Sequence, residues 1–327
     1  MEHNELTRVQ LPAAVHLTRL GYTYIKKKEL RQDKDEETNI LINRFRSAFL
    51  SLNSDANQED FDNVFKNIKV ELAQDDLGKS FFERLQGKKE YKLIDWENLE
   101  NNTFEFSLEV ECVNDGEEFR PDITLFINGL PLSFIEVKKP NAIRDGKTGI
   151  QSEFERIEKR FKNKKFRKFI NITQLITYSD NKEYDQTQGA QYQGSYYSST
   201  AYQKTKFNAF KEEDFASCKV ALSQLDSQKE DIILKDWNRP TYKYQDEFDV
   251  NKKEDTPTNR FLTSMYQKER FFFFLRYGIV YVAEKGKDGL VQLQKHVMRY
   301  PQYFATQAIK KMIPCCKMKC NKKDMLV

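Results

Sequence analysis

The strongest constraint on the fold is the dipeptide Asn128-Gly129, which stands between two predicted strands, 122–128 and 132–138. Both residues tolerate the positive φ angles that a tight turn between antiparallel strands requires. An Asn-Gly pair flanked by such runs therefore predicts a β-hairpin. Side chains along a strand alternate between its two faces, so Glu136 and Lys138 share one face.

The rest of the chain predicts helices before this hairpin and a crossover after it. Apolar residues recur at helical spacing over 38–52, in a stripe of Ile42, Phe45, Phe49 and Leu52, and a second helical stretch covers about 60–86. Apolar and acidic residues alternate over 104–113 as in a strand, a highly charged helix is expected over 148–163, and a buried strand over 169–178. This order predicts an α/β fold with a mixed sheet flanked by helices.

The composition excludes several classes of protein. Basic and acidic residues number 54 and 50, for a formal net charge of +4, so any contact with a nucleic acid has to come from a local patch. No apolar segment approaches the length of a membrane span, and the polar N-terminus lacks a signal-peptide pattern. Five cysteines at irregular spacing argue against a disulfide framework, so we expect a cytoplasmic protein without a membrane partner.

The register of the hairpin decides whether Asp122, at the start of the first strand, meets Glu136 in the second. A regular two-residue loop would turn Asp122 away from the face that carries Glu136 and Lys138. One additional residue in the loop, or one bulge, brings it back to that face. Gly129 tolerates the conformation of a bulge, and Pro131 cannot donate to a regular ladder. We therefore predict an odd-length loop or a bulge at this turn.

In that register, two carboxylates and one ammonium group converge at one end of the sheet. Such charges are costly to bury together unless they are paired or bind a metal ion. Mg²⁺ prefers hard oxygen ligands, and Asp122, Glu136 and the backbone carbonyl of Val137 supply three. A bound Mg²⁺ would activate a water molecule and neutralise a phosphate group, while Lys138 would orient that water or stabilise the transition state. The pattern thus indicates metal-dependent phosphodiester hydrolysis.

The spacing alone is weak support, because Glu-x-Lys triplets recur in a chain this charged; Glu90-Tyr91-Lys92 is another. Pro121-Asp122, in contrast, is the only Pro-Asp of the sequence, and it opens a strand that leads into the hairpin. The alternative interpretation is an edge hairpin with a solvated charged face.

Together with its surroundings, this motif resembles the nuclease motif of the R (restriction) subunit of type I restriction endonucleases, within the PD-(D/E)xK superfamily. The similarity extends over about residues 15–312 and includes segments that lead into the motor domains of that family. The matching segments are Arg120–Asn141, Leu20–Tyr24, Ile40–Asn53, Phe169–Asp180, Tyr266–Arg270 and Arg299–Ala305.

The resemblance implies Asp122 and Glu136 as metal ligands and Lys138 as the catalytic lysine. Members of the superfamily commonly add an acidic residue from the first helix, for which Glu37 is a candidate. The alternative for Glu37 is a solvated residue at the start of a helix.

The family also often carries a Gln-x-x-x-Tyr motif on the helix after the lysine. Gln151 lies at the corresponding distance and is a candidate catalytic residue, but Glu155 replaces the tyrosine. Gln174-x-x-x-Tyr178 fits the same pattern but falls in a predicted strand, so we do not assign it this role.

In the family, an ATP-dependent helicase motor follows the nuclease region. This chain has no Gly-x-x-x-x-Gly-Lys-Ser/Thr loop, so the motor is expected to be absent and ATP to serve only the full-length R subunit. We expect an endonuclease domain over 1–235, a connector over 236–258, the start of a motor-proximal region over 259–313 and a disordered tail over 314–327. The tail cysteines lack a fourth ligand for a zinc site; they are Cys315, Cys316 and Cys320.

Two segments could contact double-stranded DNA. A cluster of basic residues near the end of the charged helix could hold a phosphate backbone, or could be a solvated helix end. Over 184–205, tyrosines among polar residues could stack on bases, or could belong to an ordinary surface segment. The basic candidates are Lys159, Arg160, Lys162, Lys164, Lys165, Arg167 and Lys168.

The expected function is therefore Mg²⁺-dependent cutting of DNA by the nuclease part of a type I site-specific deoxyribonuclease, in defence against foreign DNA. Modification (M) and specificity (S) subunits would be its partners, and the chain alone is expected to bind metal weakly and to cut little. The alternatives are a non-catalytic DNA-binding or assembly module of the same fold and another nuclease of the superfamily, such as a repair enzyme.

Overall fold

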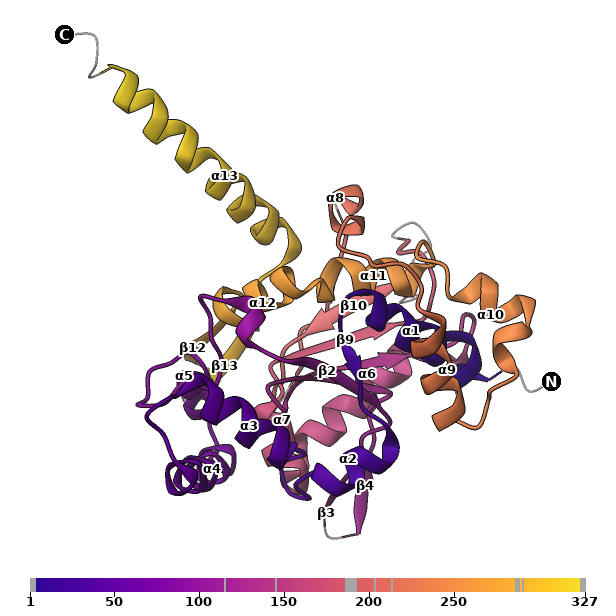
Figure 1. The fold of residues 1–327 in the computed structure, drawn as a ribbon, viewed down its shortest axis with the longest axis horizontal. Coiled ribbons are helices and arrows are strands. Elements are labelled where there is room, and N and C mark those ends of the chain that lie inside the picture. Colours follow the sequence, from indigo (N-terminus) through magenta and orange to yellow (C-terminus); the bar gives the residue numbers. More distant parts are fainter. Residues whose placement is uncertain are drawn as a thin grey trace.

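The computed structural model describes residues 4–114, 116–144, 146–185, 193–202, 204–212, 214–285, 289 and 291–323, with the backbone alone for residues 144 and 313–323. A seven-stranded sheet lies at its centre (Figure 1). In spatial order the strands are β1 (Thr23–Tyr24), β2 (Phe104–Leu108), β5 (Ile123–Ile127), β6 (Leu130–Val137), β9 (Leu175–Ser179), β10 (Ser195–Ser198) and β11 (Asn208–Ala209).

The sheet is mixed, as predicted. β2, β5 and β6 form an antiparallel meander, and β9 runs parallel to β6 after a crossover through α6 (Gly149–Lys162) and α7 (Arg167–Ile172). β5 and β6 lie inside the sheet, and every residue of both strands is buried. The alternative of an edge hairpin with a solvated face is therefore wrong.

Helices and short strand pairs surround the sheet. In Figure 1, α3 to α5 gather at one end of the molecule, while α1 lies with α9 and α10 at the other. The helices are α1 (Leu11–Arg19), α2 (Lys27–Asp33), α3 (Ile42–Leu52), α4 (Gln58–Leu72), α5 (Lys79–Leu85), α8 (Phe215–Lys219), α9 (Ser227–Asp236), α10 (Asp246–Asn251), α11 (Pro257–Tyr266), α12 (Lys268–Tyr277) and α13 (Tyr300–Lys323), with single turns η1 (Leu6–Gln10), η2 (Leu99–Asn101), η3 (Lys164–Phe166) and η4 (Tyr242–Tyr244). The separate strand pairs are β3 (Cys112–Asn114) with β4 (Glu117–Phe119), β7 (Ile143–Arg144) with β8 (Lys147–Thr148), and β12 (Ile279–Lys285) with β13 (Val291–Val297).

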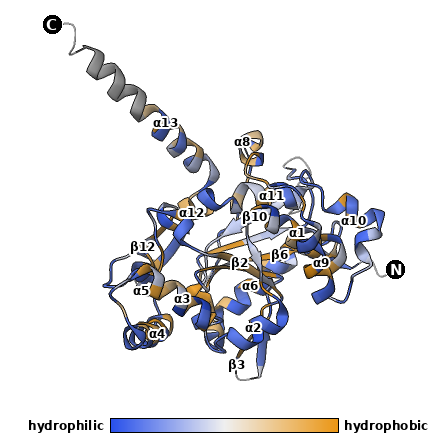
Figure 2. Ribbon diagram, viewed as in Figure 1, coloured by the Kyte–Doolittle hydropathy of each residue, from blue (hydrophilic) through white to orange (hydrophobic). Residues whose placement is uncertain are grey.

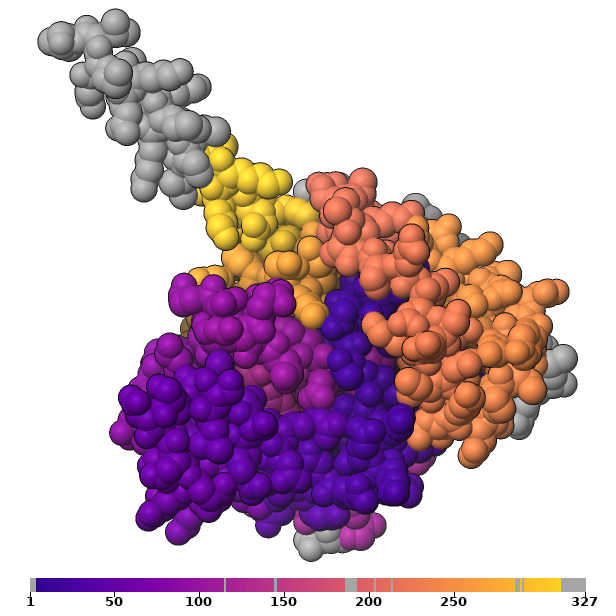
Figure 3. All heavy atoms as spheres, viewed as in Figure 1, coloured from indigo at the N-terminus to yellow at the C-terminus, as the bar shows by residue number. Residues whose placement is uncertain are grey.

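One hydrophobic cluster runs from Val9 to Tyr303 and includes residues of the sheet and of most helices. Figure 2 shows the apolar colour concentrated in the central strands, with polar residues outside. Segments from both ends of the chain lie side by side on the surface in Figure 3, because α9 and α10 pack against the N-terminal helices.

Several predicted elements have different limits in the structure. Residues 169–178 do not form one strand, because α7 runs to Ile172 and β9 begins only at Leu175; a short apolar run can be buried as either element. The stretch 60–86 is split into α4 and α5 at Gly78, whose φ is 76°. The strand predicted over 104–113 breaks at Glu109, which has a φ of 49°.

The segment 236–258 includes η4 and α10, and Arg8 pairs with Glu247 of α10 at 2.7 Å. Helix α13 leaves the body of the molecule (Figure 1), and its backbone is helical through 314–323, where a disordered tail was expected. Residues 324–327, and the side chains of the three tail cysteines, lie outside the described part. The domain limits themselves stay predictions.

Candidate functional site

A bulge in β6 brings Asp122 and Glu136 to the same face of the sheet. The turn itself has two residues, Asn128 and Gly129, with φ of 53° and 76°. Beyond the turn the register shifts by one residue, which leaves Leu132 without a partner on β5. The prediction of a bulge is thus confirmed, although it lies three residues beyond Gly129 and the loop is not odd-length. In the shifted register, Asp122 stands opposite Glu136.

The turn is held from several sides, which fixes this register. A Cβ atom at Gly129 would lie 2.7 Å from the backbone nitrogen of Phe45 and 2.8 Å from the carbonyl oxygen of Leu41. The Leu41 N–H donates to the Gly129 carbonyl at 2.9 Å. The side chain of Asn128 is buried and accepts a hydrogen bond from the Thr103 N–H at 2.8 Å. Only glycine fits this close approach to the start of α3.

The ammonium group of Lys138 lies among four carboxylates. Its Nζ is 3.1 Å from Glu5 Oε1, 3.5 Å from Asp122 Oδ2, 3.7 Å from Glu153 Oε2 and 3.8 Å from Glu136 Oε2. We call these five residues the Lys138 cluster. Nζ also donates to the carbonyl oxygen of Val137 at 2.8 Å. Burial alone would lower the pKa of Lys138, but the surrounding carboxylates raise it, so the group stays cationic.

Glu136 is the least compensated member of the cluster. Its side chain is 3% exposed, and Oε1 has no hydrogen-bond partner among the described residues. Arg160 Nη1 approaches Oε1 only to 3.8 Å. Burial, reinforced by the charges of Glu153 and Asp122, raises the pKa of Glu136 well above its usual value. This carboxylate must therefore take up a proton or gain a cation.

Asp122 is fixed by hydrogen bonds from two other segments. Its Oδ2 accepts from the Val137 N–H at 2.7 Å, and its carbonyl oxygen accepts from Gln10 Nε2 at 2.7 Å. The first bond joins the beginning of the first strand to the end of the second. Asp122, Glu136, Val137 and Lys138 thus meet at one end of the hairpin, as predicted.

Two further acids of the site, Glu5 and Glu153, were not identified from the sequence. Glu5 precedes η1, and its pKa is raised by burial despite the nearby Lys138. Glu153 lies on the buried stripe of α6, is 1% exposed and pairs with Arg156 at 2.7 Å and Arg160 at 3.5 Å. A carboxylate within an apolar helical stripe was the signal that could have identified Glu153. Nothing in the sequence distinguishes Glu5.

Gln151 and Glu37 make other contacts. The Gln151 N–H is capped by Thr148 Oγ1 at 3.3 Å, and residues two apart on a helix face different directions, so Gln151 does not share the orientation of Glu153. Glu37 is exposed and pairs with Lys168 at 2.6 Å and Lys69 at 3.7 Å. The acids that join Asp122 and Glu136 at Lys138 are thus Glu5 and Glu153, and the roles of Gln151 and Glu37 stay predictions.

Tyr178, the last residue of the second Gln-x-x-x-Tyr match, lies in strand β9 as expected. It stands beside Glu136 in the parallel register, and its buried hydroxyl has no partner among the described residues. Burial first, and then the charges of Glu136 and Glu153, raise its pKa well above the usual value. Its hydroxyl therefore stays protonated beside the Lys138 cluster.

The basic residues around the end of α6 divide into three groups. Arg160 belongs to the site and stacks 4.1 Å from the ring centre of Phe119. Three others are paired: Lys165 with Glu117 at 2.8 Å, Arg167 with Asp75 at 3.3 Å and Lys168 with Glu37 at 2.6 Å. The exposed remainder, for which the described part of the chain offers no ion pair, is Lys159, Lys162 and Lys164. A DNA contact here stays a prediction and rests mainly on these three.

The oxygen atoms around Lys138 match a hard divalent cation in their chemistry. Asp122, Glu136 and the Val137 carbonyl converge, and Glu136 Oε1 lacks a partner. The ammonium group lies among them, so a metal ion held by the same atoms would have to displace it. With Lys138 in this position, no three His, Cys, Asp or Glu side chains of the described residues surround a common metal position. The residues therefore fit Mg²⁺ on condition that Lys138 moves.

No helix in the described part of the chain has the length and apolar character needed to cross a bilayer.

Three curated relatives come from Methanocaldococcus jannaschii and are named as endonuclease subunits of type I restriction enzymes. The MjaVIIP subunit is 39% identical over 32% of this chain and 9% of its own length, the MjaIXP subunit 30% over 55% and 19%, and the MjaVIIIP subunit 28% over 47% and 13%. The chain thus spans less than a fifth of the length of each relative. Residues 2–214 match the family described as the N terminus of the type I restriction enzyme R protein, so the chain belongs to that family.

Proposed function

We propose that this chain is the DNA-cutting part of a type I restriction enzyme and hydrolyses phosphodiester bonds with Mg²⁺, in defence against foreign DNA. The observation that carries the proposal is the convergence of Asp122, Glu136 and Lys138 at a buried end of the sheet. Four carboxylates would repel a DNA phosphate, and the three cations beside them, Lys138, Arg156 and Arg160, are fewer than the carboxylates. A divalent cation would remove this repulsion.

The residues have distinct roles in this proposal. Asp122, Glu136 and the carbonyl of Val137 would hold Mg²⁺, which when bound polarises a phosphate group and lowers the pKa of a coordinated water. The Lys138 side chain, once displaced from among the carboxylates, would donate a hydrogen bond to the attacking water or to a phosphate oxygen. Glu153 and Arg160 would position Glu136 from α6.

The partner subunits are inferred from the family and not from the residues of the Lys138 cluster. Modification and specificity subunits would select the DNA, and the Lys138 cluster would act on the phosphodiester backbone, which carries no sequence information. Double-stranded DNA would be held without sequence preference by exposed cations such as Lys159 and Lys164. ATP would serve only the motor of a full-length R subunit.

The alternative is a DNA-binding or assembly module that keeps this fold without cutting. Such a module has no need for a nearly unexposed Glu136 with an unpartnered oxygen, because an uncompensated buried carboxylate lowers stability. This cost is understandable where a metal ion binds.

The test is cleavage of plasmid DNA by a reconstituted R, M and S complex with Mg²⁺ and ATP. Asp122→Ala and Lys138→Ala should each reduce the cleavage rate by about 10²–10³-fold, the usual effect of losing a transition-state contact. Lys66→Ala, at an exposed position of α4, serves as the matched control and should cut at the wild-type rate. Undiminished cutting by both site variants would leave the proposal without its active site.

A further inference from the structure

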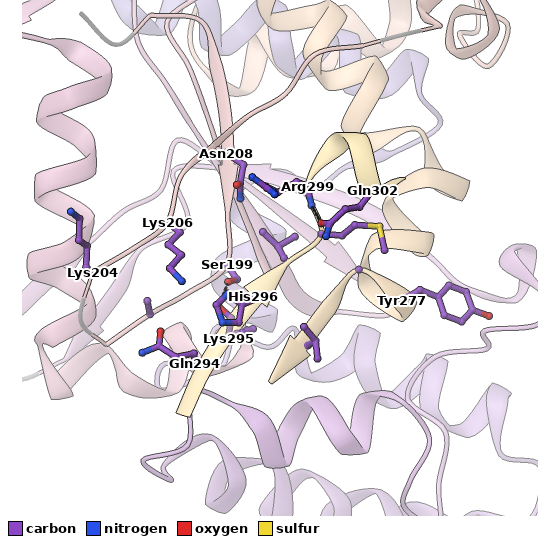
Figure 4. Close-up of a pocket in the computed structure, with 15 residues that line it drawn as sticks. Ser199, Lys204, Lys206, Asn208, Tyr277, Gln294, Lys295, His296, Arg299 and Gln302 are labelled. Carbon is purple, nitrogen blue, oxygen red and sulfur yellow. Dashed lines mark hydrogen bonds between the residues drawn. The ribbon is translucent and has the colours of Figure 1, made fainter. Parts of the chain in front are cut away.

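A hollow of about 550 Å³ lies between β13, residues 199–202 and 204–208, and the start of α13, and none of its lining residues belongs to the Lys138 cluster (Figure 4). No residue that lines it is acidic. Its exposed cationic side chains come from two segments of the chain, Lys204 and Lys206 from one and Arg299 from the other, and Lys295 and His296 lie beside them. An unbalanced positive lining of this kind attracts anions.

The outer cations are free to meet a ligand. Lys204, Lys206 and Arg299 are exposed, and the described residues provide no carboxylate partner for them. In Figure 4, Lys206 lies beside the strand that carries Gln294 and His296, and Arg299 lies near the end of that strand. Three of the seven basic residues near the end of α6, in contrast, are neutralised by ion pairs: Lys165, Arg167 and Lys168.

The wall behind these cations is rigid. Lys295 is buried, and its Nζ donates to the Thr173 carbonyl at 3.1 Å and to Thr200 Oγ1 at 3.2 Å. Ser199 Oγ donates to the Lys295 carbonyl at 3.0 Å. These bonds tie β13 to the segment that carries Lys204 and Lys206. The arrangement of the outer cations is therefore largely formed before a ligand arrives.

A neighbouring hollow limits where an anion can lie. It shares Lys204, Lys206 and Gln294 with the first but is also lined by Asp75, Asp76 and Glu284. His296 lies 3.3 Å from Glu284, so any charge on its ring is already balanced. The anion site is consequently on the side of Lys206 and Arg299.

We propose that this hollow holds the phosphate backbone of DNA, as a second contact in addition to the cutting site; the identity of the ligand rests on the proposed function. Surface lysine and arginine side chains, together with the backbone N–H groups at the start of a long helix, are the usual partners of backbone phosphates. The one tyrosine of the lining, Tyr277, points away from the hollow in Figure 4. The contact is accordingly with phosphate and not with bases.

The test uses the full chain and a short fluorescein-labelled DNA duplex in EDTA, so that no cutting occurs, and measures the dissociation constant by fluorescence anisotropy at several salt concentrations. Lys206→Glu and Arg299→Glu should each weaken binding by about tenfold at low salt, and Lys206→Gln should lower the salt slope by about one. Lys66→Glu makes the same charge change at an exposed site of α4 that lines neither hollow, and it should bind within about twofold of wild type.

Two comparisons decide the source of the phosphate. Wild-type affinity for the duplex in both reversal variants, with unchanged thermal unfolding, overturns the proposal. Loss of tripolyphosphate binding in these variants with unchanged duplex binding also overturns it, in favour of a small phosphate ligand. Because this assay contains no Mg²⁺ and follows binding alone, its result does not depend on the cleavage test, so a failure of the cutting site and a failure of the hollow are distinguishable.

Discussion

The clusters of acids around Arg44 and around Lys138 differ in how completely the central cation is paired with its acids. Arg44 binds Glu29, Asp33 and Glu105, each at 2.9 Å, through three different nitrogen atoms. Lys138 is surrounded by four carboxylates at 3.1–3.8 Å, of which only Glu5 lies at hydrogen-bond distance. The planar guanidinium satisfies several partners at once, whereas an ammonium group acts as a point charge.

The comparison shows that an excess of acids does not by itself make a site. The Arg44 cluster joins α2, α3 and β2 by completed hydrogen bonds, so its charges serve the fold. The Lys138 cluster leaves an oxygen of Glu136 without a hydrogen-bond partner among the described residues, and its four acids outnumber Lys138, Arg156 and Arg160. Its structure is suited to take up a further cation.

The largest expected difference between the clusters is in metal binding. Glu136→Gln should weaken Ca²⁺ binding by at least about 100-fold, because it removes a charged ligand and its Coulomb attraction. Glu105→Gln makes the same substitution in the Arg44 cluster and should leave Ca²⁺ binding unchanged. Calorimetric titration of the full chain measures both, and Ca²⁺ replaces Mg²⁺ as a probe. Identical heats for wild type and Glu136→Gln would refute the ligand assignment.

The second prediction concerns stability, which a substitution in the Arg44 cluster should lower more than a substitution in the Lys138 cluster. Arg44→Met should lower the free energy of unfolding by about 2–3 kcal/mol, less than the 3–5 kcal/mol of a fully buried pair because the Arg44 side chain is 27% exposed. Urea denaturation of the two proteins measures the difference. Glu136→Gln, in the other cluster, is the matched comparison. A loss under about 0.5 kcal/mol for Arg44→Met would mean that the Arg44 cluster is an ordinary surface network.

The hairpin could be predicted because its requirements are local. Asn128-Gly129 indicates the turn, and the two-residue periodicity of β5 and β6 makes the position of Asp122 a question of register. The need for an added residue followed from the chemistry expected of Asp122 and Glu136. Its location at Leu132 did not, because it depends on how β6 pairs with β9 and β5 together.

The remainder of the site depends on contacts between distant parts of the chain. Glu5 approaches Lys138 across 133 positions, and no local pattern encodes such a meeting. Arg160 appeared to belong to a basic patch, yet its neighbours in the fold are Glu136 and Glu153. Residues 169–172 had the composition of a strand, but their burial against α4 and α5 is equally satisfied by a helix.

The third prediction is that Glu136→Gln, which should weaken metal binding, makes the folded protein more stable. Burial raises the folded-state pKa of Glu136 above its unfolded value, so the folded protein binds more protons and its stability falls as the pH rises above about 4.5. Glu136→Gln removes this fall and should raise the free energy of unfolding by about 1–2 kcal/mol at neutral pH. Glu105→Gln should change it by less than about 0.5 kcal/mol, because the lost hydrogen bond from Arg44 offsets the relief of a carboxylate whose pKa is also raised by burial. Urea denaturation at pH 5 and pH 7.5 measures the free energy of unfolding of both variants. A lower stability of Glu136→Gln would show that the charge of Glu136 is already compensated in the Lys138 cluster.

The smallest effect belongs to Lys295, a buried cation with hydrogen bonds but no carboxylate partner in the described structure. Burial lowers its folded-state pKa to about 7, while the unfolded chain keeps a value near 10.5. Between these values the unfolded state binds more protons, so the stability of wild type should rise by about 1 kcal/mol per pH unit between pH 7.5 and pH 9.

Lys295→Met removes the proton that is lost on folding, and Lys206→Met is the matched control at an exposed position. Urea denaturation over this pH range should give a flatter curve for Lys295→Met, whereas Lys206→Met should follow wild type. Parallel curves for all three proteins would contradict the burial of an uncompensated ammonium group. The three cations differ in the acids around them. Arg44 is paired with hydrogen-bonded acids, and Lys138 is surrounded by four carboxylates that keep its ammonium group protonated. Lys295 has no carboxylate partner in the described structure, so it loses its proton at a lower pH than Lys138.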